Sequence, residues 1–116
     1  MSMIEQTETW VDICKFEDIL QNMGRCALFE NEQVAIFRVL EAGVEKIYAI
    51  DNYCPFSQAN IISRGIVGSV SDKTVVASPL YKQHFDLATG QCLEDEAVSV
   101  KTYSVRFEAG MVQLAA

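Results

Sequence analysis

Two stretches of the chain combine residue types that could hold a metal ion. The first is Cys54-Pro55-Phe56-Ser57, and the second is Ser78-Pro79-Leu80-Tyr81-Lys82-Gln83-His84. Each sets a thiol or a hydroxyl beside a proline, which is typical of a rigid loop that presents side chains at fixed positions. Most of the other residues lack the imidazole and thiolate groups that bind transition metals well. The two stretches have the outline of metal-binding loops without most of the donors.

The elements that position these loops are predicted to be short β-strands. Apolar, β-branched runs separated by turn residues lie at 10–14, 26–29, 34–39, 46–50, 74–77, 85–87, 98–107 and 111–114. Between the first two runs, Phe16, Ile19, Leu20 and Met23 are spaced by three and four, which predicts one or two helical turns. About nine or ten short strands with frequent turns predict an all-β antiparallel sandwich or barrel with a short helical segment near the N-terminus.

The length and composition of the chain predict one domain, residues 1–116, with its core at about 10–114. Of the 116 residues, 50% are hydrophobic, which suffices for a core that needs no metal or disulfide for stability. Cys14, Cys26, Cys54 and Cys92 form no C-x-x-C pair and are expected to be free thiols. Cys14 and Cys26 are predicted to be small core residues.

The charge of the chain excludes several classes of partner. The formal net charge is -7, and the 9 Lys and Arg residues are scattered, so neither nucleic acid nor an anionic membrane is an expected partner. The run Glu94-Asp95-Glu96 is predicted to be a solvated turn. The first residues resemble no signal peptide and no run is long enough to span a membrane, so we expect a cytoplasmic protein.

Between residues 10 and 114 the chain resembles the Rieske family. In that family one strand ends in a C-x-H loop, a second ends in a C-x-x-H loop, and a Phe-Asp strand runs on to a Thr-Gly turn. The matching stretches here are Asp51-Asn52-Tyr53-Cys54-Pro55-Phe56, Ser78-Pro79-Leu80-Tyr81 and Phe85-Asp86-Leu87-Ala88-Thr89-Gly90. The resemblance implies that Cys54, Phe56, Ser78 and Tyr81 lie where two cysteines and two histidines would hold a 2Fe-2S cluster.

That donor set is poor for iron. Phe56 has no donor atom, and the oxygens of Ser78 and Tyr81 do not replace imidazole or thiolate. We therefore expect a degenerate cluster site, with no metal, no cofactor and no catalytic residue in this chain. His84 is the only histidine and lies beyond the ligand positions, so it is either a packed or hydrogen-bonded residue or a contact for a partner. Cys54 is interpreted as a partly buried remnant thiol, since no positive charge adjoins it.

Within the Rieske-like group, the chain resembles the small subunits of assimilatory NAD(P)H-dependent nitrite reductase. The resemblance rests on three stretches, 33–38, 48–57 and 77–87, of which the last keeps the Rieske frame while replacing its ligands. It implies a cytoplasmic enzyme that reduces nitrite to ammonium in nitrate assimilation. In that enzyme a large subunit carries FAD, siroheme and an iron-sulfur cluster, and this chain is an accessory subunit.

The loops are then expected to serve the large subunit. Phe56, Tyr81, Lys82, Gln83 and His84 are predicted to dock on it, while the aromatic rings also fill the space of the missing cluster. Two other functions stay open on the residues alone. One is a non-catalytic Rieske-like binding or regulatory module of another oxidoreductase, and the other is an electron carrier, which would require iron and sulfide.

Overall fold

The computed structural model describes residues 9–80 and 82–115. This part of the chain forms β-strands and two 3-10 helices and has no α-helix. The strands are β1 (Trp10–Lys15), β2 (Met23–Phe29), β3 (Glu32–Glu41), β4 (Val44–Asp51), β5 (Tyr53–Cys54), β6 (Ala59–Asn60), β7 (Ile66–Val70), β8 (Lys73–Ala77), β9 (His84–Asp86), β10 (Val105–Glu108) and β11 (Met111–Ala115). The 3-10 helices are η2 (Phe16–Asp18) and η3 (Ile62–Arg64). The prediction of an all-β protein is confirmed.

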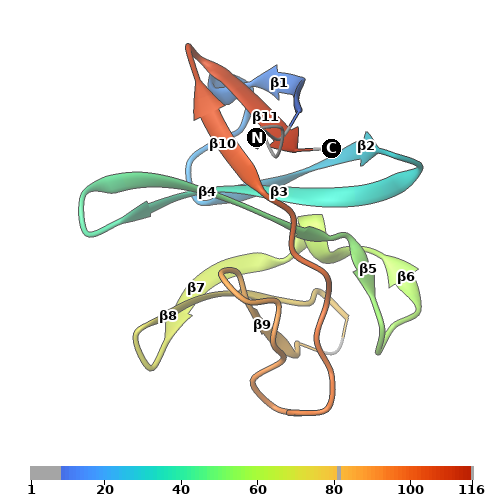
Figure 1. Cartoon of the computed structure of the whole chain (residues 1–116). Helices are drawn as coiled ribbons and strands as arrows, with labels where there is room; N and C mark the ends of the chain where they lie inside the picture. The colour runs from blue at the N-terminus through green and yellow to red at the C-terminus, as the bar shows by residue number, and fades with distance from the viewer. Residues whose placement is uncertain (1–8, 81, 116) are drawn as a thin grey trace, which may run out of the picture.

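The strands form three main antiparallel sheets, stacked as layers (Figure 1). The order is β1-β11-β10 in the first sheet, β2-β3-β4 in the second and β7-β8-β9 in the third, with β5-β6 as a small fourth sheet. The sheet β2-β3-β4 lies in the middle. In Figure 1 the first and last strands, β1 and β11, lie in the upper sheet, and the sheet β7-β8-β9 lies on the opposite side of the middle layer.

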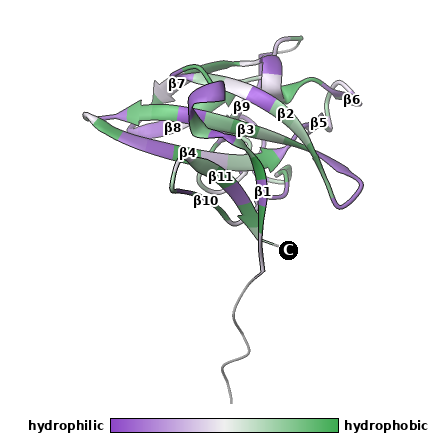
Figure 2. Cartoon of the chain, turned by 90° about the horizontal axis from the view of Figure 1, so that it is seen from above, coloured by the Kyte–Doolittle hydropathy of each residue, from purple (hydrophilic) through white to green (hydrophobic). Residues whose placement is uncertain are grey.

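The middle layer exists because β3 is apolar on both faces. Its residues from Val34 to Phe37 are all fully buried, as is typical of a strand covered on both sides. Since side chains alternate along a strand, Ala35, Phe37 and Val39 enter one apolar cluster, while Val34 and Ile36 enter another. Figure 2 shows hydrophobic and hydrophilic residues alternating along several of the strands.

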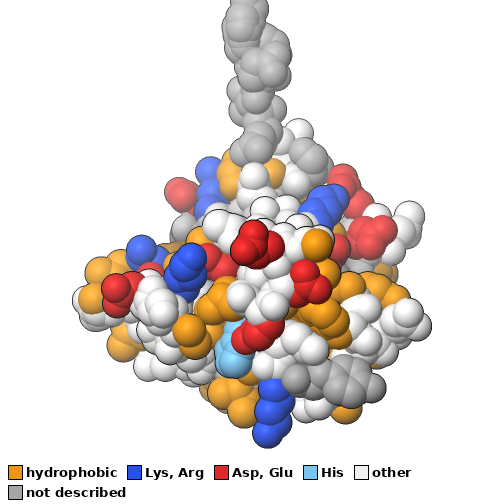
Figure 3. Space-filling view, turned by 90° about the horizontal axis from the view of Figure 1, so that it is seen from below, with side chains coloured by type: hydrophobic (Ala, Val, Ile, Leu, Met, Phe, Trp, Pro, Cys, Tyr) orange, Lys and Arg blue, Asp and Glu red, His pale blue; other side chains and the backbone are white. Residues whose placement is uncertain are grey.

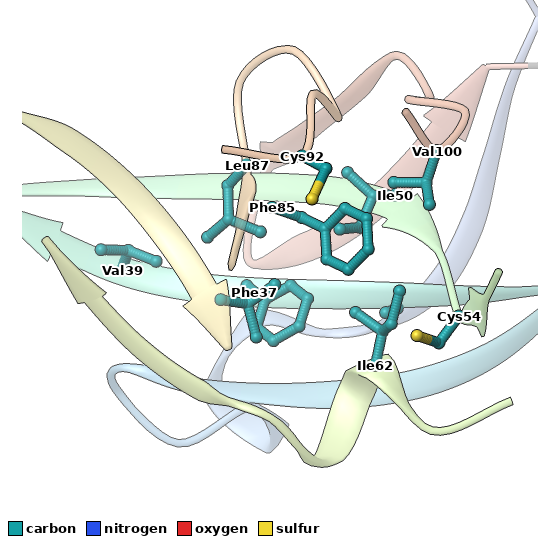
Figure 4. Packing of buried hydrophobic residues seen from close by; sticks show 11 residues of the cluster. Phe37, Val39, Ile50, Cys54, Ile62, Phe85, Leu87, Cys92 and Val100 are labelled. Carbon is teal, nitrogen blue, oxygen red and sulfur yellow. The ribbon is translucent and has the colours of Figure 1, made fainter. Parts of the chain in front are cut away.

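The two apolar clusters form separate cores. The lower core joins β3 to the third sheet through Phe37, Phe85 and Ile62, and Cys54 and Cys92 are buried members of it (Figure 4). The upper core joins the middle sheet to β11 through Val112 and Leu114. Strand β3 is the only one to supply more than two fully buried residues to the pair of cores within the described residues. It therefore divides the interior into a half near the loops and a half near the chain ends.

The predicted helical turns near the N-terminus are reduced to η2, a single 3-10 turn. The chain then leaves helical geometry, because Ile19 turns into the core at 1% exposure and Asn22 adopts a positive φ of 62°. Arg38 fixes this segment: its guanidinium donates to the Ile19 carbonyl at 2.9 Å and lies over the Phe16 ring at 4.3 Å. Tertiary contacts therefore outweigh the helical spacing.

Two further predictions are corrected. The run at 98–107 is a regular strand only from Val105, because the preceding residues cross between layers and make only isolated bridges, Gln91 with Ser99 and Ile50 with Thr102.

Cys26 is exposed and not a core residue, whereas Cys14 packs partly buried against the upper core. All four cysteines are free. No helix among the described residues is long and apolar enough to cross a membrane.

Gly24 allows β2 to approach the lower core closely. A Cβ at this position would lie 2.5 Å from Cε1 of Phe37 and 2.6 Å from the Ser63 carbonyl oxygen. A Cβ at Gly68 would meet nothing within 4 Å.

We predict that Gly24→Ala lowers the free energy of unfolding by about 1–3 kcal/mol through overpacking, measured by urea denaturation. Gly68→Ala, the control, should change it by no more than about 1 kcal/mol; equal effects would contradict the close packing.

Candidate docking site

The first loop is anchored by Asn52, a polar residue only 2% exposed. Its side-chain oxygen accepts a hydrogen bond from the Ser63 amide at 2.6 Å, and its side-chain nitrogen donates to Gln33 Oε1 at 3.1 Å. Its backbone carbonyl accepts from the Ile62 amide. One side chain thus ties η3 and the start of β3 to the point where β4 ends, and it sets the direction in which the loop leaves the sheet.

Cys54 lies at the base of this loop and is fully buried. Its Sγ lies 3.7 Å from Ser78 Oγ and accepts a hydrogen bond from Ser57 Oγ at 3.4 Å. Burial raises the pKa of the Cys54 thiol, but the hydrogen bonds, chiefly from the hydroxyl and amide of Ser57, lower that pKa below its ordinary value overall. The thiol is therefore more deeply buried than predicted. Hydrogen bonds from hydroxyls and amides lower its pKa, as a neighbouring positive charge would.

The second loop is closed by its own backbone. The Ser78 amide donates to the Gln83 carbonyl at 2.9 Å, and the Lys82 amide donates to the Ser78 carbonyl at 3.0 Å. Lys82 has a φ of 61°, which completes the tight turn. The loop buries Ser78 and leaves Leu80 60% exposed at its tip. Tyr81 lies outside the described residues.

His84, at the start of β9, is held by an acidic residue. Its Nδ1 lies 2.6 Å from Glu94 Oε2, and its amide donates to Glu94 Oε1 at 2.8 Å. Burial raises the pKa of Glu94, but the contacts with His84 outweigh this and lower the pKa below its usual range. The run Glu94-Asp95-Glu96 is exposed in bend and turn geometry, as predicted, and Glu94 is in addition a structural partner of His84. Figure 3 shows the histidine beside acidic side chains on the face that carries the loops.

Of the four predicted cluster positions, the fold brings Cys54 and Ser78 together. The Phe56 ring packs partly buried against the lower core, with its centroid 6.2 Å from that of Phe85. These three positions therefore offer one thiol, one hydroxyl and one ring without a donor atom. A Rieske cluster requires two thiolates and two imidazoles, and the described residues hold no group of three His, Cys, Asp or Glu side chains suited to a metal. This donor set does not fit a 2Fe-2S cluster.

Several residues of the site escaped the sequence analysis. Asn52 and Ser57 act through local hydrogen bonds, and Glu94 acts across a loop, so neither type nor spacing singles them out. Leu80 was not singled out, although it is 60% exposed at the loop tip. An asparagine that follows a buried strand is the one signal that could have indicated an anchor.

The role of Asn52 as an anchor can be tested by removing its amide. Asn52→Ala leaves the Ser63 amide without its partner and removes one of the two donors to Gln33 Oε1, the other being the Cys26 thiol. We therefore predict a loss of about 1–3 kcal/mol of unfolding free energy in urea denaturation. Asn60→Ala is the control, since Asn60 lies exposed on β6 and should cost under about 0.5 kcal/mol. A similar loss from both variants would show that Asn52 is not an anchor.

Comparisons with known proteins agree with this geometry. Residues 9–115 match the model of a family described as Rieske-like [2Fe-2S] domain. The nitrite reductase (NADH) small subunit of Escherichia coli is 48% identical over 105 residues, which are 90% of this chain and 95% of that protein. A crystal structure described as a putative NADH-dependent nitrite reductase small subunit from Mycobacterium tuberculosis is 36% identical, with a TM-score of 0.87, covering 95% of this chain and 96% of that one.

A third relative has a different chain organisation. It is described as a nitrite reductase [NAD(P)H] large subunit, from Klebsiella oxytoca, and is 36% identical over 103 residues, which are 89% of this chain but 10% of that protein. A domain of this kind therefore also occurs as a small part of a much longer chain. The family match and the identity over nearly the whole length show that the chain belongs to the Rieske-like family and, within it, to the nitrite reductase (NADH) small subunits.

Proposed function

We propose that this chain is an accessory subunit of a cytoplasmic nitrite reductase, that it holds no iron-sulfur cluster, and that its loop end docks on the large subunit. The loop end is the surface formed by residues 53–58, 78–80 and 82–84. Its proposed contacts are Phe56, Tyr81, Lys82, Gln83 and His84, joined by Leu80. The redox centres and the chemistry then belong to the large subunit, and this chain supports them by binding.

The donor set supports the absence of a cluster. Only Cys54 among the described positions is a good iron ligand, and its sulfur already accepts a hydrogen bond from the Ser57 hydroxyl and lies 3.7 Å from Ser78 Oγ. The Phe56 ring packs against the core at the place of a second ligand. It thereby acts as a plug, and the part of the ring that stays exposed is available for contact with a partner.

The observation that carries the docking proposal is apolar exposure on rigid loops. Leu80 is 60% exposed and Tyr53 is 46% exposed, and Pro55 and Pro79 beside them are exposed as well. In addition, Gln83 Oε1 is buried and has no hydrogen-bond partner among the described residues. Rigid apolar anchors bind at low entropic cost, so this composition favours a protein partner.

The Klebsiella relative supports the large subunit as that partner. Its domain and the rest of a large subunit share one chain, which is expected if the two associate. In the present fold Trp10 pairs with Ala115, in the layer farthest from the loop end (Figure 1). A linker attached at either end of such a domain would therefore leave the loop end open for contact.

The absence of a cluster predicts a colourless protein. Purified without oxygen, the chain should contain less than about one tenth of an iron atom and of an acid-labile sulfide per molecule, because the donor set lacks imidazole. Iron and sulfide analysis with a visible spectrum measures this. Two irons and two sulfides per chain would overturn the proposal and favour an electron carrier.

The docking role predicts a position-dependent effect of charge. Leu80→Asp should weaken binding to the purified large subunit by at least about tenfold, because a charge would be buried at the interface, while leaving the thermal unfolding midpoint unchanged. Leu28→Asp is the matched control, since Leu28 is 72% exposed on β2. Calorimetric titration gives both affinities, and equal effects would contradict docking through the loop end.

A further inference from the structure

Strand β7 is a free edge of the third sheet. The order β7-β8-β9 leaves one side of β7 without a neighbouring strand. A two-residue turn at Ser71 and Asp72, both with positive φ, joins β7 to β8 and pairs Val70 with Lys73. Residues that flank such a turn bond to each other, and bonded pairs then alternate along the ladder. The backbone N–H and C=O of Val67 and Ser69 therefore point away from β8, toward the free edge.

The same alternation can be checked on the neighbouring hairpin. The turn at Ala42 and Gly43 directs the Leu40 amide away from β4, and there it finds a partner, Asn22 Oδ1, at 3.1 Å. No hydrogen bond within residues 9–80 and 82–115 reaches the outward groups of Val67 and Ser69. The outward amide of Leu40 on β3 is thus capped by Asn22. The outward groups of Val67 and Ser69 on β7 have no such partner among the described residues.

The edge of β7 also lacks the usual protection against pairing. Exposed edge strands commonly carry a charged residue, a proline or a bulge, yet Ile66–Val70 contains no charge and no proline and pairs with β8 without a bulge. Ile66 is 77% exposed, the largest value among the described large hydrophobic residues, and Val70 is 37% exposed. Gly68 has open space where a side chain would be, as at positions that another backbone approaches.

The edge borders a groove with room for an extended segment. Its volume is about 490 Å³, and residues 67–69 of β7 face residues 39–42 at the end of the β3–β4 hairpin across it. In Figure 1, β7 lies between β8 and the middle layer. Glu41 and Asp72 are the charged residues of the lining. Hydrogen bonds from Thr74 and then Tyr48 lower the pKa of Glu41, so its carboxylate stays ionised.

The free edge of β7 begins beside the loop end, and the groove lies toward its other end. Ile66, the first residue of β7, pairs with Ala77, and Ala77 directly precedes the loop that holds Ser78 and Leu80. A partner that covers the loop tips would therefore reach the start of the free edge without leaving the surface. Glu41 is already paired with Lys46 at 3.4 Å, so Asp72 is the acidic residue left for a partner's cation. The adjacency of the loop end to the start of β7, together with Asp72 beside its end, favours an apolar segment of that same partner that carries a basic residue.

We propose that an extended segment of the nitrite reductase large subunit adds a fourth strand to the sheet β7-β8-β9, pairing with the free edge of β7. The segment places apolar side chains against Ile66 and Val70 and a lysine or arginine near Asp72. This inference rests on the proposed function, because the loop end and the free edge then bind one partner. A second copy of this chain, paired edge to edge, is the competing occupant.

A proline at position 69 tests the pairing. Ser69→Pro removes the outward N–H and places a ring on the free edge, while the bonded pairs formed by Gly68 and Val70 remain. Binding to the purified large subunit should weaken at least about tenfold. Ser69→Ala keeps the N–H and should bind like the unaltered chain. Equal affinity of the two folded variants would overturn the inference.

Hydrogen exchange on the unaltered chain gives a second test that does not require Ser69→Pro to fold. The amides of Val67 and Ser69 should exchange rapidly in the free chain and at least about tenfold more slowly in the complex. A complex in which both amides still exchange rapidly would overturn the edge pairing but leave the proposed function standing. Failure of the large subunit to bind any variant would overturn both.

The competing occupant gives a different signature. If a second copy occupied the edge, the same amides would be protected in the free chain at high concentration, and sedimentation would detect a dimer that Ser69→Pro abolishes. That result would overturn the assignment of the edge to the large subunit. A monomeric free chain with unprotected edge amides is the expected result.

Discussion

The fold depends on one constraint, the burial of β3 on both faces. A strand whose consecutive residues are all apolar must be covered from both sides, because either exposed face would place large side chains such as Ile36 or Phe37 in water. The upper sheet and the lower sheet are the two covers. These two covers also set the positions of the first and last strands and of the loops. Strands β1 and β11 lie in the upper sheet, and the loop after β8 leaves the lower sheet.

The loop end is built from the lower half of this arrangement. The hydrogen bonds of Asn52 direct the first loop out of β4, and the contact between Cys54 and Ser78 joins it to the second. Phe56 then closes the space between the loops against Phe85. The loop end thus has hydrogen-bonded polar residues at its base and the exposed apolar side chain of Leu80 at its tip.

The sequence was informative where local pattern and tertiary environment agree. The β2–β3 hairpin and strand β4 follow from turn residues and β-branched runs, and the loop frame from the Cys-Pro and Ser-Pro stretches. The helical spacing at 15–23 predicted one or two helical turns, and a single 3-10 turn forms, because Ile19 and Arg38 draw the chain into the core after it. The strand predicted at 98–107 was too long, because a crossing between layers has no signature in periodicity. Glu94 was missed because its partner, His84, is distant in sequence.

The division of the interior by β3 has a consequence for how such a domain changes over evolution. Substitutions at the loop end alter contacts within the lower core only, since Val34 and Ile36 face a separate set of neighbours on the other side. Metal ligands could therefore be exchanged for phenylalanine or serine while the upper half of the domain kept its packing unchanged. Strand β3 thus separates the packing of the loop end from that of the upper core, and changes at the loop end leave the residues of the upper core with the same neighbours.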